Sequence, residues 1–215
     1  MGCVTQLRDY EDWHRHYDDP DSSLSWRLRR VRAALHTALD RSPGPCRILS
    51  ACAGDGRDVI GVLRQRSDAD RVSAVLVELH PGLAQRARIS AAAAGLGGIE
   101  VRMADAGRSD AYAGAVPAQM VLLVGIFGNI SDADLWRLLG FAPQLCASGA
   151  TLLWSRGLDE SDRNEQVRGR LGAAGFTELD YSTSGGNDAA ALGVVRYDGP
   201  PVELRPGQPL FTFLR

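Results

Sequence analysis

A short apolar run that passes into a glycine turn and then a helix start constrains this chain more than any other stretch. Residues 48–58 read ILSACAGDGRD, and residues 59–63 continue with apolar side chains at helical spacing. The pattern predicts a strand, a tight turn around Gly54 and Gly56, and a helix. Small residues let a ligand approach the backbone, and the unpaired N–H groups of a helix's first turn favour acceptor or anionic groups. We therefore expect a nucleotide-like cofactor at this turn.

Strand-like and helix-like segments alternate along the rest of the chain. The expected helices are residues 24–39, 81–95, 132–145 and 160–174, and the further expected strands are residues 72–78, 99–103, 120–124, 150–155, 176–182, 191–197 and 210–214. This alternation predicts an α/β fold with a mostly parallel sheet and helices on both faces. The last three strand segments have no helix between them, so we expect an antiparallel element at the far edge. Ligands of such sheets bind beyond the carboxyl ends of the strands.

Composition excludes several classes of protein. All 24 basic residues are arginine, so the chain has neither the lysine of a Walker phosphate loop nor that of a pyridoxal Schiff base. A formal net charge of −2 argues against a nucleic-acid binder, and we interpret the cluster Arg27, Arg29, Arg30 and Arg32 as a solvated helix face. The cysteines form no CxxC pair, which predicts reduced thiols and no metal site. No secretory leader or membrane-length apolar run is visible, so we expect a cytoplasmic protein without a membrane partner.

Two acids follow the next two predicted strands in the order that a nucleoside requires. Glu78 ends the strand 72–78, where a carboxylate can accept hydrogen bonds from both ribose hydroxyls. The alternative is that Glu78 only caps the following helix. Asp105 follows the strand 99–103 and can accept from the exocyclic amine of adenine, although alone it would be an ordinary loop acid. Three correctly ordered positions favour an adenosine-type cofactor.

Residues 49–56, 75–78 and 103–106 resemble motifs I to III of class I S-adenosylmethionine-dependent methyltransferases. The resemblance implies a seven-stranded Rossmann-like domain over residues 46–215 with an antiparallel C-terminal strand, preceded by a lid segment and helix over residues 1–45. It also implies S-adenosylmethionine as cofactor and S-adenosylhomocysteine as product. The expected cofactor-binding residues are Tyr17, Ala53, Gly54, Asp55, Gly56, Arg57, Glu78, Leu79, Asp105, Ala106 and Gly125. Residues 13–20, 125–131 and 210–213 further resemble a group of actinobacterial proteins of this class, which has no assigned substrate.

The first motif departs from the family pattern at two positions. Ser50 stands where the family usually has an acid, and Cys52 stands where it usually has the first glycine. One consequence that we expect is weaker binding of the amino group on the methionine part of the cofactor. Arg57 can pair with a carboxylate and Asp58 occupies an N-cap position, so both can compensate. A surface arginine and a simple helix cap are the alternative interpretation.

The loop after the fourth strand should lie beside the transferable methyl group. Residues 125–129 lack the Asn/Asp-Pro-Pro-aromatic motif of nucleobase methylation, and neither convergent metal-binding acids nor the cysteine triad of radical enzymes is visible. Asn129 can orient a substrate hydroxyl or amine, or it can cap the next helix, for which Ser131 is also suited. The predicted substrate-binding residues are Trp13, Phe127 and Arg156, the last as a partner for a carboxylate or phosphate.

An N-terminal group of aromatic and imidazole side chains is the expected source of a general base. His14 and His16 lie between Trp13 and Tyr17, in a segment that commonly folds over the cofactor in this class. A neutral imidazole can remove a proton from an attacking hydroxyl or amine, so we assign catalytic roles to His14, His16 and Asn129. The alternative is that Trp13 and Tyr17 pack on the sheet while both histidines face water.

These features predict a methyltransferase that acts on O or N of a small molecule by in-line displacement. Secondary metabolism is one setting for such an enzyme. Three alternatives stay open. Transfer of the aminocarboxypropyl group, or a cyclisation, would use the same sulfonium. A nicotinamide-dependent oxidoreductase would share Gly54, Gly56 and Glu78 but would need a third glycine. A cofactor-binding protein without catalysis is the third. We expect a small-molecule partner and no nucleic acid, and we leave a homodimer open.

Overall fold

The protein forms one seven-stranded sheet, of which the computed structural model describes residues 17, 19–158, 161, 163–185 and 189–214. The strands stand in the order β3-β2-β1-β4-β5-β7-β6. Their bounds are β1 (Cys46–Ala51), β2 (Val72–Glu78), β3 (Ile99–Met103), β4 (Ala118–Leu123), β5 (Cys146–Gly157), β6 (Phe176–Thr183) and β7 (Ala190–Tyr197). Strand β7 runs antiparallel to β5 and β6, whereas the remaining pairs are parallel. This arrangement confirms the expected Rossmann-like, mostly parallel sheet with its antiparallel C-terminal element.

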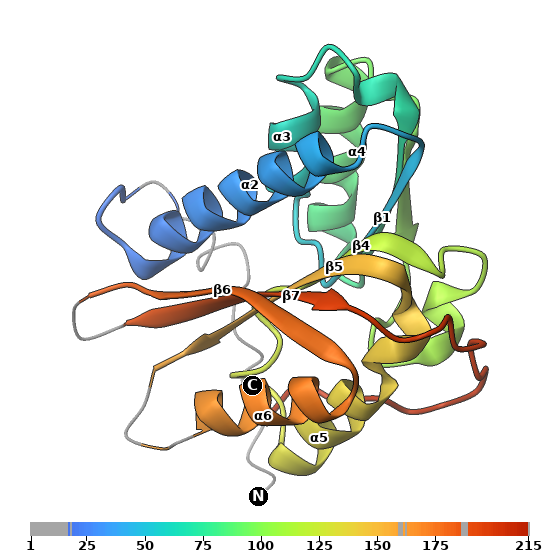
Figure 1. Cartoon of the computed structure of the whole chain (residues 1–215). Helices are drawn as coiled ribbons and strands as arrows, with labels where there is room; N and C mark the ends of the chain where they lie inside the picture. The colour runs from blue at the N-terminus through green and yellow to red at the C-terminus, as the bar shows by residue number, and fades with distance from the viewer. Residues whose placement is uncertain (1–16, 18, 159–160, 162, 186–188, 215) are drawn as a thin grey trace, which may run out of the picture.

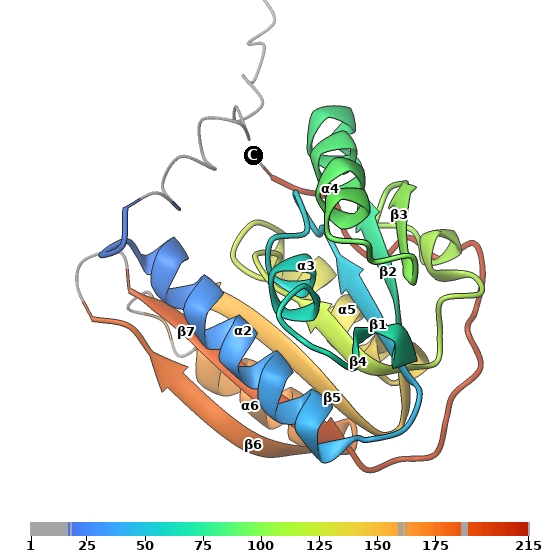
Figure 2. The same cartoon turned by 90° about the horizontal axis from the view of Figure 1, so that it is seen from above.

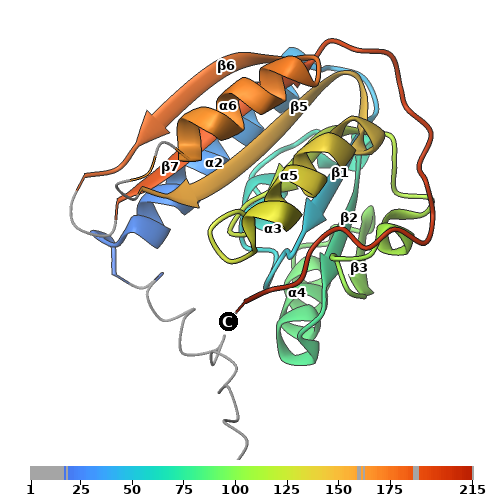
Figure 3. The same ribbon diagram turned by 90° about the horizontal axis from the view of Figure 1, so that it is seen from below.

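Helices cover both faces of the sheet (Figure 1). The helices are α2 (Ser23–Arg41), α3 (Val59–Leu63), α4 (Pro81–Ala93), α5 (Asp132–Phe141) and α6 (Arg163–Ala173), and the 3-10 turns are η2 (Ala69–Arg71), η3 (Ser109–Tyr112) and η4 (Ala142–Leu145). Helix α2 lies along β7 and β5 on the same face as α3 and α4 (Figure 2). Helices α5 and α6 cover the opposite face (Figure 3). Within the described part of the chain, no helix combines the length and the apolar character needed to cross a membrane.

Helix α2 begins and packs as its sequence predicts. The Ser22 hydroxyl oxygen accepts a hydrogen bond from the Ser25 backbone N–H at 3.1 Å, which satisfies one donor of the first turn. Val31, Leu35 and Leu39 recur at helical spacing and are buried against the sheet. The helix ends at Arg41, shortly before Pro43 interrupts the backbone hydrogen bonding.

A buried tryptophan fixes how closely β5 and β7 can pack. Trp154 of β5 is fully buried, and its ring stacks on Phe127 with centroids 5.8 Å apart and planes 18° from parallel. Gly193 is the partner of Trp154 across the β5–β7 pair. A Cβ atom on Gly193 would stand 2.3 Å from the indole ring. Because Gly193 of β7 has no side chain, the Trp154 ring, the largest in the core, fits between the two strands' side chains.

One predicted strand is wrong. Residues 210–214 form no strand; isolated bridges join Pro209 to Arg108 and Phe213 to Ile130. The segment passes beside α5 (Figure 3), where the Thr212 backbone N–H donates to Asp134 at 3.2 Å. Leu210 and Phe211 are buried by this packing. Apolar side chains that insert between other elements give the same sequence pattern as a buried strand, so periodicity alone could not separate the two.

Candidate functional site

The carboxyl ends of the central strands surround a cavity of about 530 Å³, within the usual range for small-molecule sites. It is lined by Tyr17, Arg27, Leu28, Val31, Ser50, Ala51, Cys52, Ala53, Gly54, Asp55, Arg57, Asp58, Glu78, Leu79, His80, Pro81, Leu83, Asp105, Ala106, Val124, Gly125, Asn129 and Phe213. Every residue predicted to bind the cofactor is in this lining except Gly56. The structure therefore brings the sequence-predicted set together, at the edge of the sheet where parallel α/β folds bind ligands.

The loop after β1 makes its turn through three residues with positive φ. They are Cys52 at 54°, Gly54 at 59° and Gly56 at 70°. A residue with a Cβ is strained in this region by about 1–2 kcal/mol, so Cys52 holds a conformation that suits glycine. Gly56 is buried below the cavity wall, where a Cβ would stand 2.7 Å from the Ile60 side chain. This position packs the loop onto the core, and the predicted contact of Gly56 with the cofactor stays a prediction.

Glu78 joins the loops that follow β1 and β2. One carboxylate oxygen accepts from the Gly54 backbone N–H at 2.8 Å, and the other accepts from the His80 backbone N–H at 2.7 Å. The cap of α4 is His80, whose ring Nδ1 accepts from the Leu83 N–H at 3.3 Å, so Glu78 is not the helix cap. A carboxylate has about four acceptor sites, and the two backbone bonds leave capacity for ligand hydroxyls at the cavity wall.

The third wall of the cavity comes from the loop after β3. Asp105 accepts a hydrogen bond from the Gly107 backbone N–H at 2.8 Å, which closes a local turn and fixes the direction of its side chain. Ala106 is buried, whereas Leu79 is 62% exposed at the cavity's border. Burial is the main cause of a raised pKa of the Cys52 thiol, and the nearby carboxylates of Glu78 and Asp105 raise that pKa further. Cys52 is therefore held as a neutral thiol.

Opposite charges gather at the end of the cavity beneath α2. Arg57 forms a bidentate pair with Asp55, with an Nη2–Oδ2 distance of 2.6 Å and an Nε–Oδ1 distance of 2.9 Å. The Arg57 guanidinium also lies 4.2 Å from the centre of the Tyr17 ring. Arg27 donates from Nη2 to the Tyr17 hydroxyl at 2.8 Å. In this structure Arg57 pairs with a carboxylate of the protein itself, that of Asp55, and its predicted contact with the cofactor stays a prediction.

Asp58 is the N-cap of α3, as the sequence predicts. Its carboxylate accepts from the Val59 backbone N–H at 2.7 Å. Burial raises the pKa of Asp58, the neighbouring charge of Asp55 raises it further, and hydrogen bonding together with Arg27 lowers it. A charged Asp58 is therefore costly to the fold at neutral pH.

Replacing Asp58 by asparagine is expected to raise the melting temperature at pH 7. Between the ordinary pKa of 3.8 and the raised folded value, the folded protein binds more protons than the unfolded chain, so stability falls as pH rises. Asparagine keeps a capping oxygen but removes the charge. Melting curves from pH 3 to pH 8 should show a gain that disappears toward about pH 3, where Asp58 is neutral in both states. Asp70→Asn, on the exposed turn η2, is the matched control; a lower melting temperature for Asp58→Asn at pH 7 would contradict this account.

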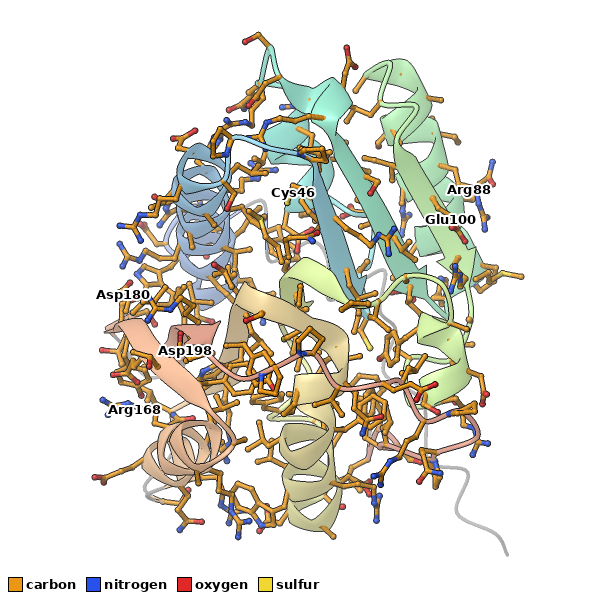
Figure 4. All side chains as sticks on the ribbon, turned by 45° about the vertical axis from the view of Figure 1, so that its right-hand side comes forward. Cys46, Arg88, Glu100, Arg168, Asp180 and Asp198 are labelled. Carbon is orange, nitrogen blue, oxygen red and sulfur yellow. The ribbon has the colours of Figure 1, made fainter. Side chains whose placement is uncertain are left out.

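The arginine cluster of α2 is a solvated face only in part, which corrects the sequence interpretation. Arg29 and Arg30 are exposed, and Arg30 pairs with Asp180 of β6 at 3.0 Å. Figure 4 shows the position of Asp180 on this side of the fold. Arg27 instead lines the cavity. Arg32 points toward α3 and donates from Nε to the Arg57 carbonyl oxygen at 3.0 Å. The missed signal is periodicity, because residues 24, 27, 28 and 31 share one helix face and three of them are apolar.

The loop after β4 forms the wall next to α2. Ser155 of β5 accepts the Gly125 backbone N–H at 2.9 Å, and Asn129 donates from its amide to the Gly125 carbonyl oxygen at 2.9 Å. Ser131 caps α5 by accepting from the Asp134 N–H, so capping is not the role of Asn129. Phe127 is fully buried against Trp154 and is not among the residues that line either cavity, and its predicted substrate contact stays a prediction.

Arg156 lines a second cavity of about 150 Å³ rather than the larger one. This cavity adjoins the first because Arg27, Gly125 and Asn129 line both. Trp13, His14 and His16 lie outside the described residues. Among the residues that the structure describes, no three His, Cys, Asp or Glu side chains converge so that they could hold a metal ion.

Solved structures place this chain in a known fold. It resembles magnesium protoporphyrin IX methyltransferase from Synechocystis PCC 6803, solved with S-adenosylmethionine bound, at 11% identity and a TM-score of 0.68, over 88% of this chain and 91% of that one. An O-methyltransferase family protein from Burkholderia thailandensis matches at 16% identity and a TM-score of 0.65, over 91% and 62%. A possible exported protein from Bordetella parapertussis matches at 18% and 0.62, over 82% and 69%.

These likenesses establish the Rossmann-like methyltransferase fold. They establish no more than the fold, because the sequence identities lie between 11% and 18%. No protein-family model and no curated protein sequence matches this chain.

Proposed function

We propose that this chain binds S-adenosylmethionine in the larger cavity and transfers its methyl group to O or N of a small molecule. The observation that carries the proposal is the position of Glu78, whose carboxylate bridges Gly54 and His80 at the cavity wall. A carboxylate at the end of the second strand is suited to accept both ribose hydroxyls of a nucleoside. The bound S-adenosylmethionine of the Synechocystis neighbour supports the same assignment.

The charged end of the cavity fits the amino-acid part of this cofactor. An α-amino acid carries one carboxylate and one ammonium group, and this end supplies the guanidinium of Arg27 together with the carboxylates of Asp55 and Asp58. We assign the ligand carboxylate to Arg27 and the ammonium to Asp58. The destabilising charge on Asp58 then has a function, since binding sites commonly retain groups that cost stability.

The chemistry needs little more than positioning and exclusion of water. S-adenosylmethionine supplies an electrophilic methyl group on a sulfonium sulfur. An acceptor oxygen or nitrogen held about 3 Å from that carbon forms a new bond to it as the carbon–sulfur bond breaks. The electron pair of the broken bond remains on sulfur, and the acceptor loses a proton. Val31, Leu28 and Phe213 line the cavity with apolar surface that excludes water from this step.

Other parts of the proposal rest on the sequence. His14 and His16 remain the proposed general bases, Asn129 the proposed orienting group and Trp13 a proposed substrate contact. The lid role of residues 1–45 and the likeness to the actinobacterial group with a role in secondary metabolism belong here as well, as does a cytoplasmic location.

Direct binding and product analysis test the proposed function. S-adenosylhomocysteine at 1 mM is expected to raise the melting temperature by several degrees, because a ligand that binds only the folded state stabilises it by mass action. Methyl transfer would then release S-adenosylhomocysteine from S-adenosylmethionine when acceptor mixtures are added. Release of methylthioadenosine would instead identify aminocarboxypropyl transfer or cyclisation. No shift with either adenosyl compound would overturn the proposal, and a shift from NADH would then favour the nicotinamide-dependent alternative.

A further inference from the structure

The second cavity is a candidate site for one end of the acceptor. It opens among the carboxyl ends of β4 and β5, the start of β7 and the first turn of α2. Five of its eleven described lining residues are glycine or alanine, namely Gly125, Gly128, Gly157, Ala189 and Ala190. At about 150 Å³ it is smaller than a typical site for a whole ligand, so it suits a single functional group. Since it shares Arg27, Gly125 and Asn129 with the larger cavity, a molecule can extend from one to the other.

Two arginine side chains are the charged part of this cavity's described lining. Two guanidinium groups line it, from Arg27 on α2 and Arg156 on β5, and its described lining contains no carboxylate. The uncharged polar lining residues are Ser23, Asn129 and Ser155. Arg156 also donates from Nη1 to the Gly157 carbonyl oxygen at 3.2 Å, which ties the guanidinium to the end of its strand. A guanidinium has five donors, so a group that contacts the protein can also bind the oxygens of a ligand.

From this arrangement we infer that the second cavity binds an anionic oxygen group of the acceptor, a carboxylate or a phosphate, through Arg156, beside the Arg27 guanidinium that the two cavities share. This inference rests on the proposed function, which places the reacting methyl group in the adjoining cavity. Planar guanidinium groups pair with both anions in a bidentate manner, so the shared chemistry is oxyanion recognition. Arg27 contributes to both cavities, whereas Arg156 contributes only to the second. Arg156 is therefore the position at which the two sites can be tested separately.

Three aryl probes that differ only in their head group test the inference. Benzoate, phenyl phosphate and benzamide are titrated by ligand-observed NMR into the full-length protein, with and without saturating S-adenosylhomocysteine. We expect at least one of the anionic probes to bind about 10-fold more tightly than neutral benzamide, and the stronger of the two identifies the head group. Arg156→Gln should abolish that preference. Arg168→Gln, which removes an exposed arginine paired with Glu178 at 2.7 Å, should leave it unchanged.

The outcomes separate this inference from the proposed function. If S-adenosylhomocysteine binds but the anions show no preference over benzamide, or keep it in Arg156→Gln, the oxyanion site is refuted while cofactor binding stands. If S-adenosylhomocysteine does not bind, the proposed function fails, and the titrations without it still decide whether Arg156 binds an anion. An equal loss of preference in Arg168→Gln would show a general charge effect and would also overturn the inference.

Discussion

Glu78→Gln is expected to weaken S-adenosylhomocysteine binding about 100-fold, because two charge-assisted hydrogen bonds to ribose hydroxyls contribute about 1.5 kcal/mol each. The amide also disturbs the site before any ligand arrives. Its NH₂ group faces one of the two backbone donors, Gly54 N–H or His80 N–H, which in the wild type donate to the Glu78 carboxylate oxygens at 2.8 and 2.7 Å. One of these donors then loses its partner. Isothermal titration calorimetry measures the change in affinity, and a melting curve measures the cost to the fold.

Glu100→Gln is the matched control for this experiment. Glu100 is an exposed carboxylate on β3 that pairs with Arg102 at 2.9 Å, and Figure 4 shows it on the outer part of the fold near Arg88. Its replacement should leave S-adenosylhomocysteine affinity within a factor of about two, because an exposed ion pair contributes little. An affinity of Glu78→Gln within threefold of the wild type would refute the role assigned to Glu78.

Gly193→Ala is expected to lower the free energy of unfolding by about 3 kcal/mol, near the upper end for added core volume. The new methyl group would stand 2.3 Å from the Trp154 ring, so the indole or the β5–β7 pairing must move. Trp154 cannot move cheaply, since it is fully buried and stacked on Phe127. Urea denaturation followed by circular dichroism measures the change.

Gly169→Ala is the same substitution at another position, and we expect it to have the opposite effect on the free energy of unfolding. Gly169 lies in α6 with nothing within 4 Å of its added Cβ. Alanine there should raise the free energy of unfolding by about 0.5–1 kcal/mol, because it reduces the backbone entropy of the unfolded chain and has a higher helix propensity. Similar effects of the two substitutions would show that the contact with Trp154 does not control the stability of this part of the sheet.

Much of the fold could be predicted because local patterns and packing agree. The strands Val72–Glu78 and Ile99–Met103 were predicted to the residue, since β-rich runs bounded by turn residues have few other solutions. The segment 210–214 could not be predicted, because its apolar side chains pack on α5 through contacts far apart in the sequence. The β5 strand is longer than residues 150–155 for the same reason, as partners on β4 and β7 extend its pairing beyond its apolar run.

The candidate site was predictable where residues follow strand ends and unpredictable where helix α2 contributes. Glu78 and Asp105 were located by their order along the chain, and both line the cavity. Arg27 was missed because a charged residue on an amphipathic helix is usually solvated; only its neighbours on the same helix face indicate that it points inward. The burial of Phe127 was not predicted, because an aromatic residue in a site-forming loop can equally turn into the core and its partner Trp154 lies in a distant strand.

The stacking of Phe127 on Trp154 gives this protein an optical property. Phe127 belongs to the loop 125–129 whose ends, Gly125 and Asn129, line both cavities, while the indole beneath it is fully buried. The sequence contains three further tryptophans, Trp13, Trp26 and Trp136, so the emission of Trp154 is isolated in a variant in which those three are replaced. A shift of the loop moves Phe127 and therefore changes the surroundings of the Trp154 indole, even while that indole stays shielded from solvent. The chain thus contains a fluorophore directly under the wall of its own site, and motion of that wall can be observed by emission spectroscopy without an added dye.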